Sequence, residues 1–136
     1  MVLLTTAMHA GAMMLAIHAV GGRKQKIESR AGAFPRMVAI SVVVLIMFLA
    51  SLFEAAAWGA LFVFRGAITD TEAAMYFSVV TYTTLGYGDV TLTPDHRMLA
   101  AFEAANGIMM FGWTTAVIVA VVQRVYAPPG AADSEH

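Results

Sequence analysis

The sequence lacks cysteine and has little charge. Without cysteine it forms no disulfide and offers no thiolate as a nucleophile or metal ligand. Only 12% of its 136 residues are charged, whereas 60% are hydrophobic. A soluble core of this size does not need so large an apolar fraction. The composition therefore predicts a single membrane-embedded domain.

Patterns typical of enzymes are missing as well. No nucleophile stands beside a base partner, and no phosphate-binding loop is present. The spacing of His9, His18 and His96 does not suit a metal site. We therefore expect no enzymatic activity and no cofactor.

Three long apolar runs are present: Val2 to Val20, Met37 to Phe64, and Met98 to Tyr126. Each is long enough to cross a hydrocarbon core of about 30 Å as an α-helix. The first run also invites interpretation as a signal peptide. No basic residue precedes it, however, which favours a retained transmembrane helix over residues 1–20.

Residues 21–36 form a basic linker, in which Gly-Gly and Pro35 mark the expected helix boundaries. Five of the eight lysines and arginines lie here, namely Arg23, Lys24, Lys26, Arg30 and Arg36. The positive-inside rule makes this linker cytoplasmic. Basic residues beside a span are explained by topology and lipid headgroups better than by nucleic-acid binding. The pattern predicts a multi-pass protein of the inner (plasma) membrane, with its N-terminus outside and a cytoplasmic tail over residues 127–136.

A short amphipathic run, about Thr71 to Tyr82, lies between the second and third apolar runs. Asp70 or Thr71 can cap it as a helix. It is too short to span a bilayer, so we expect a helix that re-enters the membrane. The residues that follow can be non-helical at membrane depth only where protein or water surrounds them.

Glycine recurs at every second position of the following loop, as Gly86 and Gly88. Consecutive carbonyls point the same way only if the backbone alternates between right- and left-handed dihedrals, and glycine takes positive φ without penalty. A ring of such carbonyls can replace the water around a monovalent cation. The loop therefore indicates an ion selectivity filter.

The heptapeptide Thr83-Thr84-Leu85-Gly86-Tyr87-Gly88-Asp89 resembles the signature of the potassium channel pore family, with Leu85 where Val or Ile is commoner. The resemblance covers roughly Met37 to Val122, and with the first span the chain resembles small bacterial channels that have one extra N-terminal helix. It implies a pore domain over residues 37–126. It also implies a K+-binding filter formed by Thr84, Leu85, Gly86, Tyr87 and Gly88.

The same resemblance implies a set of residues that support the filter: Tyr76, Phe77, Val80, Thr83 and Asp89. In the family the residue at Asp89 commonly bonds to the back of the pore helix, and Tyr76 can donate that bond here. Phe77 cannot donate to the hydroxyl of Tyr87, and Val80 replaces an acidic residue found in some members. These departures put the rigidity of the filter in doubt more than its selectivity.

Two glycines interrupt the last apolar run. By its distance from the filter, Gly107 resembles the family's hinge glycine, although a packing site between helices is the alternative, and Gly112 is the second interruption. Phe111, Thr115 and Val119 recur at every fourth position and resemble residues that line the inner pore. Such a stripe equally suits helix packing.

Two acidic residues fall within the apolar runs. Glu54 lies deep in the second run, where an unpaired charge costs about 3 kcal/mol or more. His9 lies at a similar depth, so a Glu54 to His9 contact is one hypothesis, and a bond from Glu54 to the pore-loop backbone is the other. Glu103, nearer the outer end of the last run, is expected to support the filter rather than contact ions.

One copy of the loop cannot surround an ion, and the chain contains only one. We therefore expect an all-α homotetramer, with three transmembrane helices plus a re-entrant pore helix and filter in each subunit. It would pass K+ down its gradient within membrane lipid, without a voltage sensor of the usual Arg-repeat type. The alternatives are a non-selective cation channel, a non-conducting accessory subunit of a larger K+ channel, or a module of an active K+ uptake system.

Overall fold

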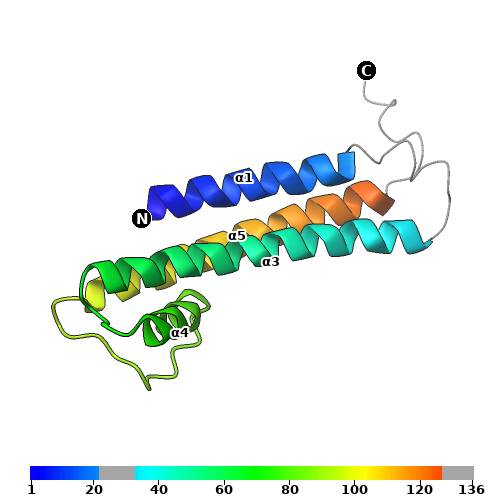
Figure 1. Ribbon diagram of the computed structural model, residues 1–136. Helices are drawn as coiled ribbons and strands as arrows, with labels where there is room; N and C mark the ends of the chain where they lie inside the picture. The colour runs from blue at the N-terminus through cyan, green and yellow to red at the C-terminus, as the bar shows by residue number, and fades with distance from the viewer. Residues whose placement is uncertain (22–32, 127–136) are drawn as a thin grey trace.

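The computed structural model describes residues 1–21 and 33–126, which contain four α-helices (Figure 1). Most of the predicted basic linker and the whole predicted tail lie outside the described residues. The helices are α1 (Val2–Gly21), α3 (Ala33–Phe64), α4 (Thr71–Tyr82) and α5 (Arg97–Tyr126).

The three long helices lie side by side, and α3 runs in the opposite direction to α1 and α5 (Figure 1). Each of the three is long and apolar enough to cross a membrane, as the apolar runs predicted. The short helix α4 lies against one end of α3 and α5 (Figure 1). The N-terminus of α1 points toward that same end. The described residues therefore have the architecture of a multi-pass membrane protein.

Helix α3 begins at Ala33, before the boundary that Pro35 was expected to mark. Proline is tolerated in the first turn of a helix, because the N–H that it lacks would have no intrahelical partner there. Pro35 therefore lies inside the first turn of α3 rather than ahead of it. The predicted bounds of α4 agree with the structure, and α5 begins one residue earlier than predicted, at Arg97.

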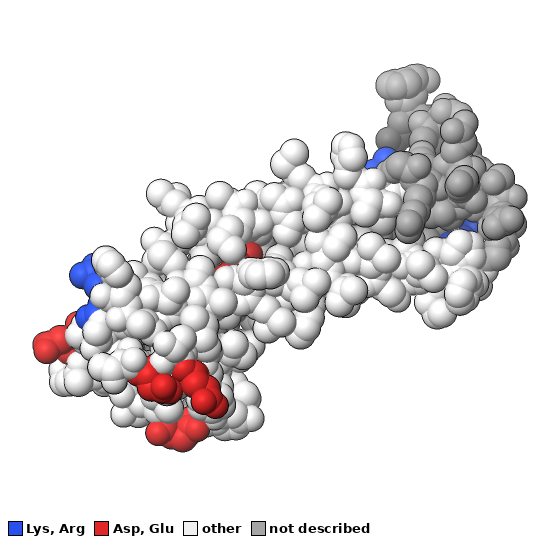
Figure 2. Space-filling model, viewed as in Figure 1, with Lys and Arg blue, Asp and Glu red and all other residues white. Residues whose placement is uncertain are grey.

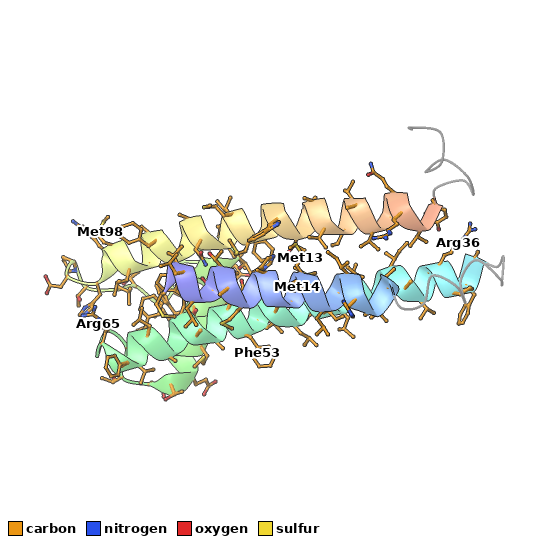
Figure 3. All side chains as sticks on the ribbon, turned by 90° about the horizontal axis from the view of Figure 1, so that it is seen from above. Met13, Met14, Arg36, Phe53, Arg65 and Met98 are labelled. Atoms are coloured by element: carbon orange, nitrogen blue, oxygen red, sulfur yellow. The ribbon has the colours of Figure 1, made fainter. Side chains whose placement is uncertain are left out.

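Charge is confined almost entirely to the two ends of the molecule. Figure 2 shows acidic side chains gathered at the end that carries α4, while the middle of the visible face is nearly free of charge. Arg36 and Arg65 lie at opposite ends of the bundle (Figure 3). An uncharged middle between charged ends is the pattern expected of a protein that spans a bilayer.

Two hydrophobic clusters hold the helices together. The first joins α3, α4 and α5 around Trp58, Phe62 and Tyr82, all of them almost fully buried. The second joins α1, α3 and α5 at the far end of the bundle. Its buried members are Ala16, Val43, Met47, Val117 and Val121. Between the two clusters, α1 contributes polar side chains rather than apolar ones.

Glycines on both neighbouring helices allow α4 to approach closely. A Cβ added at Gly59 of α3 would lie 3.3 Å from the Ala74 carbonyl oxygen on α4. A Cβ added at Gly107 of α5 would lie only 1.9 Å from the Tyr82 carbonyl oxygen. The position of α4 therefore depends on these glycines having no side chain.

Candidate functional site

Helix α4 has a defined beginning and a defined end. The Asp70 carboxylate accepts a hydrogen bond from the Ala73 backbone N–H at 2.8 Å, which caps the first turn. At the other end, Thr83 follows the last helical residue, and its hydroxyl donates to the Val79 carbonyl at 2.8 Å. The candidate filter loop therefore leaves directly from the C-terminus of α4, where the helix dipole favours a cation.

The backbone of the loop alternates in handedness. Positive φ angles occur at Thr84 (60°), Gly86 (56°) and Gly88 (79°), while Leu85 and Tyr87 keep negative ones. The glycine spacing predicted two of these three positions. Thr84 is the third, and no side-chain signal marks it, because threonine disfavours left-handed dihedrals by about 1–2 kcal/mol. Alternation of this kind is what turns successive carbonyl groups toward one side of a strand.

Val80 connects the first part of this loop to α4 by hydrogen bonds. Its carbonyl oxygen accepts from the backbone N–H groups of Leu85 at 2.9 Å and Gly86 at 3.2 Å. A carbonyl in the last turn of a helix has no intrahelical partner, so it is free to accept such bonds. The residue expected to support the filter therefore contacts the loop through its backbone, and its side chain is buried.

A second hydrogen bond holds the Asp89 end of the loop. The Tyr76 hydroxyl donates to the Asp89 carboxylate at 2.7 Å, which is the bond expected from the sequence. Both groups lie outside the three spanning helices. This hydrogen bond lowers the pKa of the Asp89 carboxyl and, with Asp89 as acceptor, raises the pKa of the Tyr76 phenol.

Phe77 packs in the hydrophobic core. Its ring meets the Phe62 ring edge to face, with 5.2 Å between centroids, and only 8% of its surface is exposed. Tyr87, by contrast, is 66% exposed in the single chain. Phe77 supports α4 against α3 by apolar packing, as suits a side chain without a donor.

The two glycines of α5 differ in their surroundings. Gly107 packs directly against the Tyr82 carbonyl, so the packing interpretation describes its contact, and a hinge role stays a prediction. A Cβ at Gly112 would meet nothing within 4 Å in the single chain.

The predicted inner-pore stripe of α5 is partly covered. The Phe111 ring lies edge to face with Tyr82, with 5.8 Å between centroids. Thr115 and Val119 are exposed, and the Thr115 hydroxyl bonds to its own helix at the Phe111 carbonyl. A pore-lining role for these three residues stays a prediction.

Glu54 is fully buried and has two side-chain partners. His9 Nδ1 lies 2.9 Å from its Oε1, and the Tyr82 hydroxyl donates to its Oε2. The hypothesis that His9 pairs with Glu54 therefore agrees with the structure, whereas the alternative partner, the pore-loop backbone, is not the one found. The three groups belong to α1, α3 and α4.

The polar contacts continue from α1 to α5. The Thr114 hydroxyl lies 3.2 Å from His9 Nε2, and Asn106 Nδ2 donates to the Thr5 hydroxyl at 2.9 Å. Sequence reasoning missed Thr5, Tyr82, Asn106 and Thr114. Helical spacing was the available signal, since Thr5 lies one turn before His9 and both fall in an apolar run.

Glu103 is also fully buried and contacts α4. Its Oε1 accepts from the Ser78 hydroxyl, while its Oε2 has no hydrogen-bond partner among the described residues. Glu103 therefore contacts α4 rather than the candidate filter loop itself. The described residues contain no group of acidic and histidine side chains arranged to hold a metal ion.

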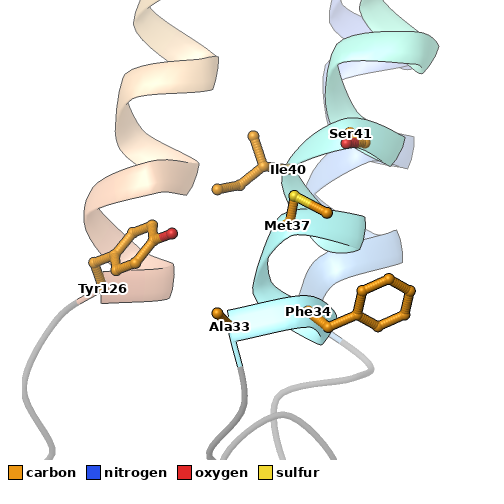
Figure 4. Close-up of a pocket in the computed structure, with 6 residues that line it drawn as sticks. All are labelled: Ala33, Phe34, Met37, Ile40, Ser41 and Tyr126. Carbon is orange, nitrogen blue, oxygen red and sulfur yellow. The ribbon is translucent and has the colours of Figure 1, made fainter.

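A pocket of about 380 Å³ lies between the N-terminal end of α3 and the C-terminal end of α5, where Ala33 and Tyr126 face each other (Figure 4). Its lining is mostly apolar, with Ser41 and Tyr126 as the polar contributors. It lies at the opposite end of α3 from α4 and plays no part in the site described above.

The fold and site define a class: a multi-pass membrane protein in which a short helix and a glycine-containing loop connect two spanning helices. Comparison with protein families gives the narrower assignment. The family described as "Ion channel" matches residues 37–124, which is more than half of the chain, so the chain belongs to this family. Its members are channels rather than enzymes. Comparisons with curated proteins and with solved structures give no match.

Proposed function

We propose that four copies of this chain form a K+-selective channel, with Thr84 to Gly88 of each copy supplying one wall of the selectivity filter. K+ would pass down its gradient between backbone oxygens of Thr84, Leu85, Gly86 and Tyr87. The proposal narrows the ion channel assignment of residues 37–124 to one ion and one assembly.

The observation that carries the proposal is the alternating backbone. Positive φ at every second residue from Thr84 to Gly88 lets carbonyl groups line one side of the strand, where they can take the place of water around a dehydrated ion. The loop is tied to α4 at both ends, through Val80 and through Asp89. A tethered strand keeps its oxygens at a fixed separation, which is what discrimination between ions of different size requires.

Large side chains of the loop are exposed in the single chain, which supports the proposed tetramer. Leu85 is 56% exposed and Tyr87 is 66% exposed, although both are large apolar or aromatic side chains. A single strand cannot encircle an ion, and a ring of identical strands follows from cyclic symmetry. Neighbouring copies would cover these side chains and complete the ring of oxygens.

The proposed orientation places α4 and the N-terminus of α1 on the outer side of the plasma membrane. It rests on the basic residues that join α1 to α3, which favour the cytoplasmic side. In this orientation the C-terminus of α4 points inward along the conduction path, where its partial negative charge favours a cation.

Ion flux from liposomes tests the proposal. The purified protein is reconstituted, and K+ and Na+ gradients are compared with and without barium for wild type, Gly86→Asp and Gly66→Asp. Gly66 is the matched control, because it also has positive φ (67°) and open space around it, but lies in the turn after α3. We expect barium-sensitive flux of K+ over Na+ for wild type and Gly66→Asp, and none for Gly86→Asp.

Two of the alternative functions give a different result in this assay. Equal flux of K+ and Na+ would favour the non-selective cation channel. An absence of flux under every gradient would favour the non-conducting accessory subunit. Flux through Gly86→Asp equal to that of wild type would show that the loop is not the filter.

A further inference from the structure

Helix α1 lies outside the matched family residues, yet it inserts a polar side chain into the bundle. His9 is fully buried in a helix that is otherwise almost entirely apolar. Burying an imidazole is unfavourable unless both of its nitrogens find partners. Here Nδ1 contacts Glu54 of α3 and Nε2 contacts Thr114 of α5. The Trp113 ring packs beside the imidazole, with 5.6 Å between the ring centroids.

The partner of His9 leads to the filter loop. Glu54 accepts a second hydrogen bond from Tyr82, which is the last residue of α4 and stands two residues before Thr84. Gly107 of α5 packs so closely against the carbonyl of the same tyrosine that a Cβ at this position would not fit. The point from which the loop departs is therefore held by α5 at its backbone and by Glu54 at its side chain.

A second polar contact fixes how α1 lies along the bundle. Asn106 of α5 donates to Thr5, one helical turn before His9, at 2.9 Å, and both groups are buried. In lipid, helices gain little from burying apolar surface against each other, so such hydrogen bonds decide register and orientation. A slip of α1 by one residue would leave Thr5, His9 and their partners unpaired together.

We propose that His9 is a positioning residue of the conduction site, and that α1 acts through Glu54 to hold the Tyr82 end of α4 and thereby the geometry of the filter. The proposal rests on the proposed channel function. It assigns a role in ion discrimination to a helix that the family match does not include. His9 does not touch the ion. Through the contact between its Nδ1 and Glu54 Oε1, it orients the carboxylate that receives the Tyr82 hydroxyl.

The test compares His9→Leu with two variants that also affect the contacts from His9 through Glu54 to Tyr82, and with one variant that leaves these contacts intact. Tyr82→Phe removes the hydroxyl that Glu54 receives, without altering α1. His9→Asn is the conservative replacement, because its amide nitrogen stands near the position of Nδ1 and can still donate to Glu54. His18→Leu is the control, since it makes the same substitution on an exposed face of α1.

Two readouts are measured on assembled channels. The first is the permeability ratio of K+ to Na+, which does not depend on how many channels are present. The second is amide hydrogen exchange over residues 83–88, where the Leu85 and Gly86 N–H groups bond to Val80 in the native loop. A role limited to stability would lower the number of channels and leave both readouts unchanged.

We expect His9→Leu and Tyr82→Phe each to lower the permeability ratio by about tenfold, which corresponds to about 1.4 kcal/mol, and to speed exchange in the loop. The double variant should change the ratio no further than either single variant, because both break one pathway. His9→Asn should restore most of the ratio, and His18→Leu should match wild type.

An assembled His9→Leu channel with the wild-type ratio and wild-type exchange would overturn the proposal. If His9→Leu does not assemble, Tyr82→Phe decides: unchanged readouts overturn the proposal, and lowered selectivity with faster exchange supports it. A wild-type channel that fails to prefer K+ would contradict the proposed function instead. In that case the exchange of residues 83–88 alone still tests the effect of His9.

Discussion

Helix α4 makes two hydrogen bonds of the same kind, each from a tyrosine hydroxyl to a carboxylate. The two tyrosines are six residues apart and lie in different surroundings. Tyr76 donates a hydrogen bond to Asp89 at the end of the loop, and Tyr82 donates one to Glu54 near the point where the loop begins. Tyr76 is 42% exposed, whereas Tyr82 is 1% exposed. Water can replace the partner of Tyr76 when the bond breaks, but nothing replaces the partner of Tyr82.

The two bonds also differ in what they connect. Tyr76 and Asp89 belong to the same stretch of chain, within the residues that match the ion channel family. Tyr82 reaches Glu54 and, through it, His9 on α1, so three helices meet at one carboxylate. The exposed hydrogen bond holds only the loop, by linking it to α4. The buried hydrogen bond makes the position of the loop depend on how α1, α3 and α4 pack within the subunit.

Of the variants considered, Gly107→Ala should have the largest effect, because it disturbs the packing around the buried residue Tyr82. The added methyl group would lie 1.9 Å from the Tyr82 carbonyl oxygen, so the backbone of α4 or α5 must move. We expect the proposed tetramer not to assemble and K+ flux to be lost, as measured by size-exclusion chromatography and liposome flux. Gly112→Ala is the control within the same helix, because its Cβ meets nothing within 4 Å. Equal behaviour of the two variants would refute the packing role of Gly107.

Tyr82→Phe and Tyr76→Phe compare the two bonds directly. Tyr82→Phe leaves one oxygen of the buried Glu54 carboxylate without its donor, which we expect to destabilise the subunit by about 1–3 kcal/mol. Tyr76→Phe removes an exposed hydrogen bond, and water can take the place of the lost donor at Asp89. Its effect on the thermal midpoint should therefore be clearly smaller. Thermal unfolding in detergent checks the order. A larger loss from Tyr76→Phe would reverse the comparison.

The smallest expected effect is the pH dependence of the exposed bond. The hydrogen bond from Tyr76 lowers the pKa of the Asp89 carboxyl. The ionised Asp89 therefore stabilises the folded protein fully above the ordinary aspartate pKa of about 4. This stabilisation is lost as the pH falls through the lowered pKa. In Tyr76→Phe the Asp89 pKa should move back up toward its ordinary value. The thermal midpoint at acid pH, compared with that of the distant control Tyr126→Phe, measures the shift. Identical acid profiles for the two variants would contradict it.

The sequence was sufficient for features that depend on short stretches of chain. Apolar runs predicted the three spanning helices, Asp70 was one of the two residues expected to cap α4, and alternating glycines predicted two of the three positive φ angles. Each of these follows from side-chain chemistry at known spacing. The Tyr76 to Asp89 bond was also predictable, through the resemblance to potassium channels, because its partners lie on either side of the loop.

Features that depend on contacts between distant helices were predicted only in part. Counting depth in the membrane put His9 at a level similar to that of Glu54 and so gave their contact as one of two hypotheses, the one that agrees with the structure. Depth alone does not specify rotation about the helix axis, so Tyr82 and Thr114 could not be recognised as their partners. The same limit left Gly107 open between hinge and packing site. The left-handed Thr84 was missed because the hydrogen bond of its backbone N–H goes to the Thr81 carbonyl of α4, which no side-chain pattern indicates.

The most direct test of the central claim is the reversal potential of the wild-type protein in a planar bilayer, with K+ on one side and Na+ on the other. A K+-selective filter predicts a reversal potential displaced strongly toward the K+ equilibrium potential and a current that barium blocks. A reversal potential near zero, with current carried equally by both ions, would contradict the account of Thr84 to Gly88 as a potassium filter.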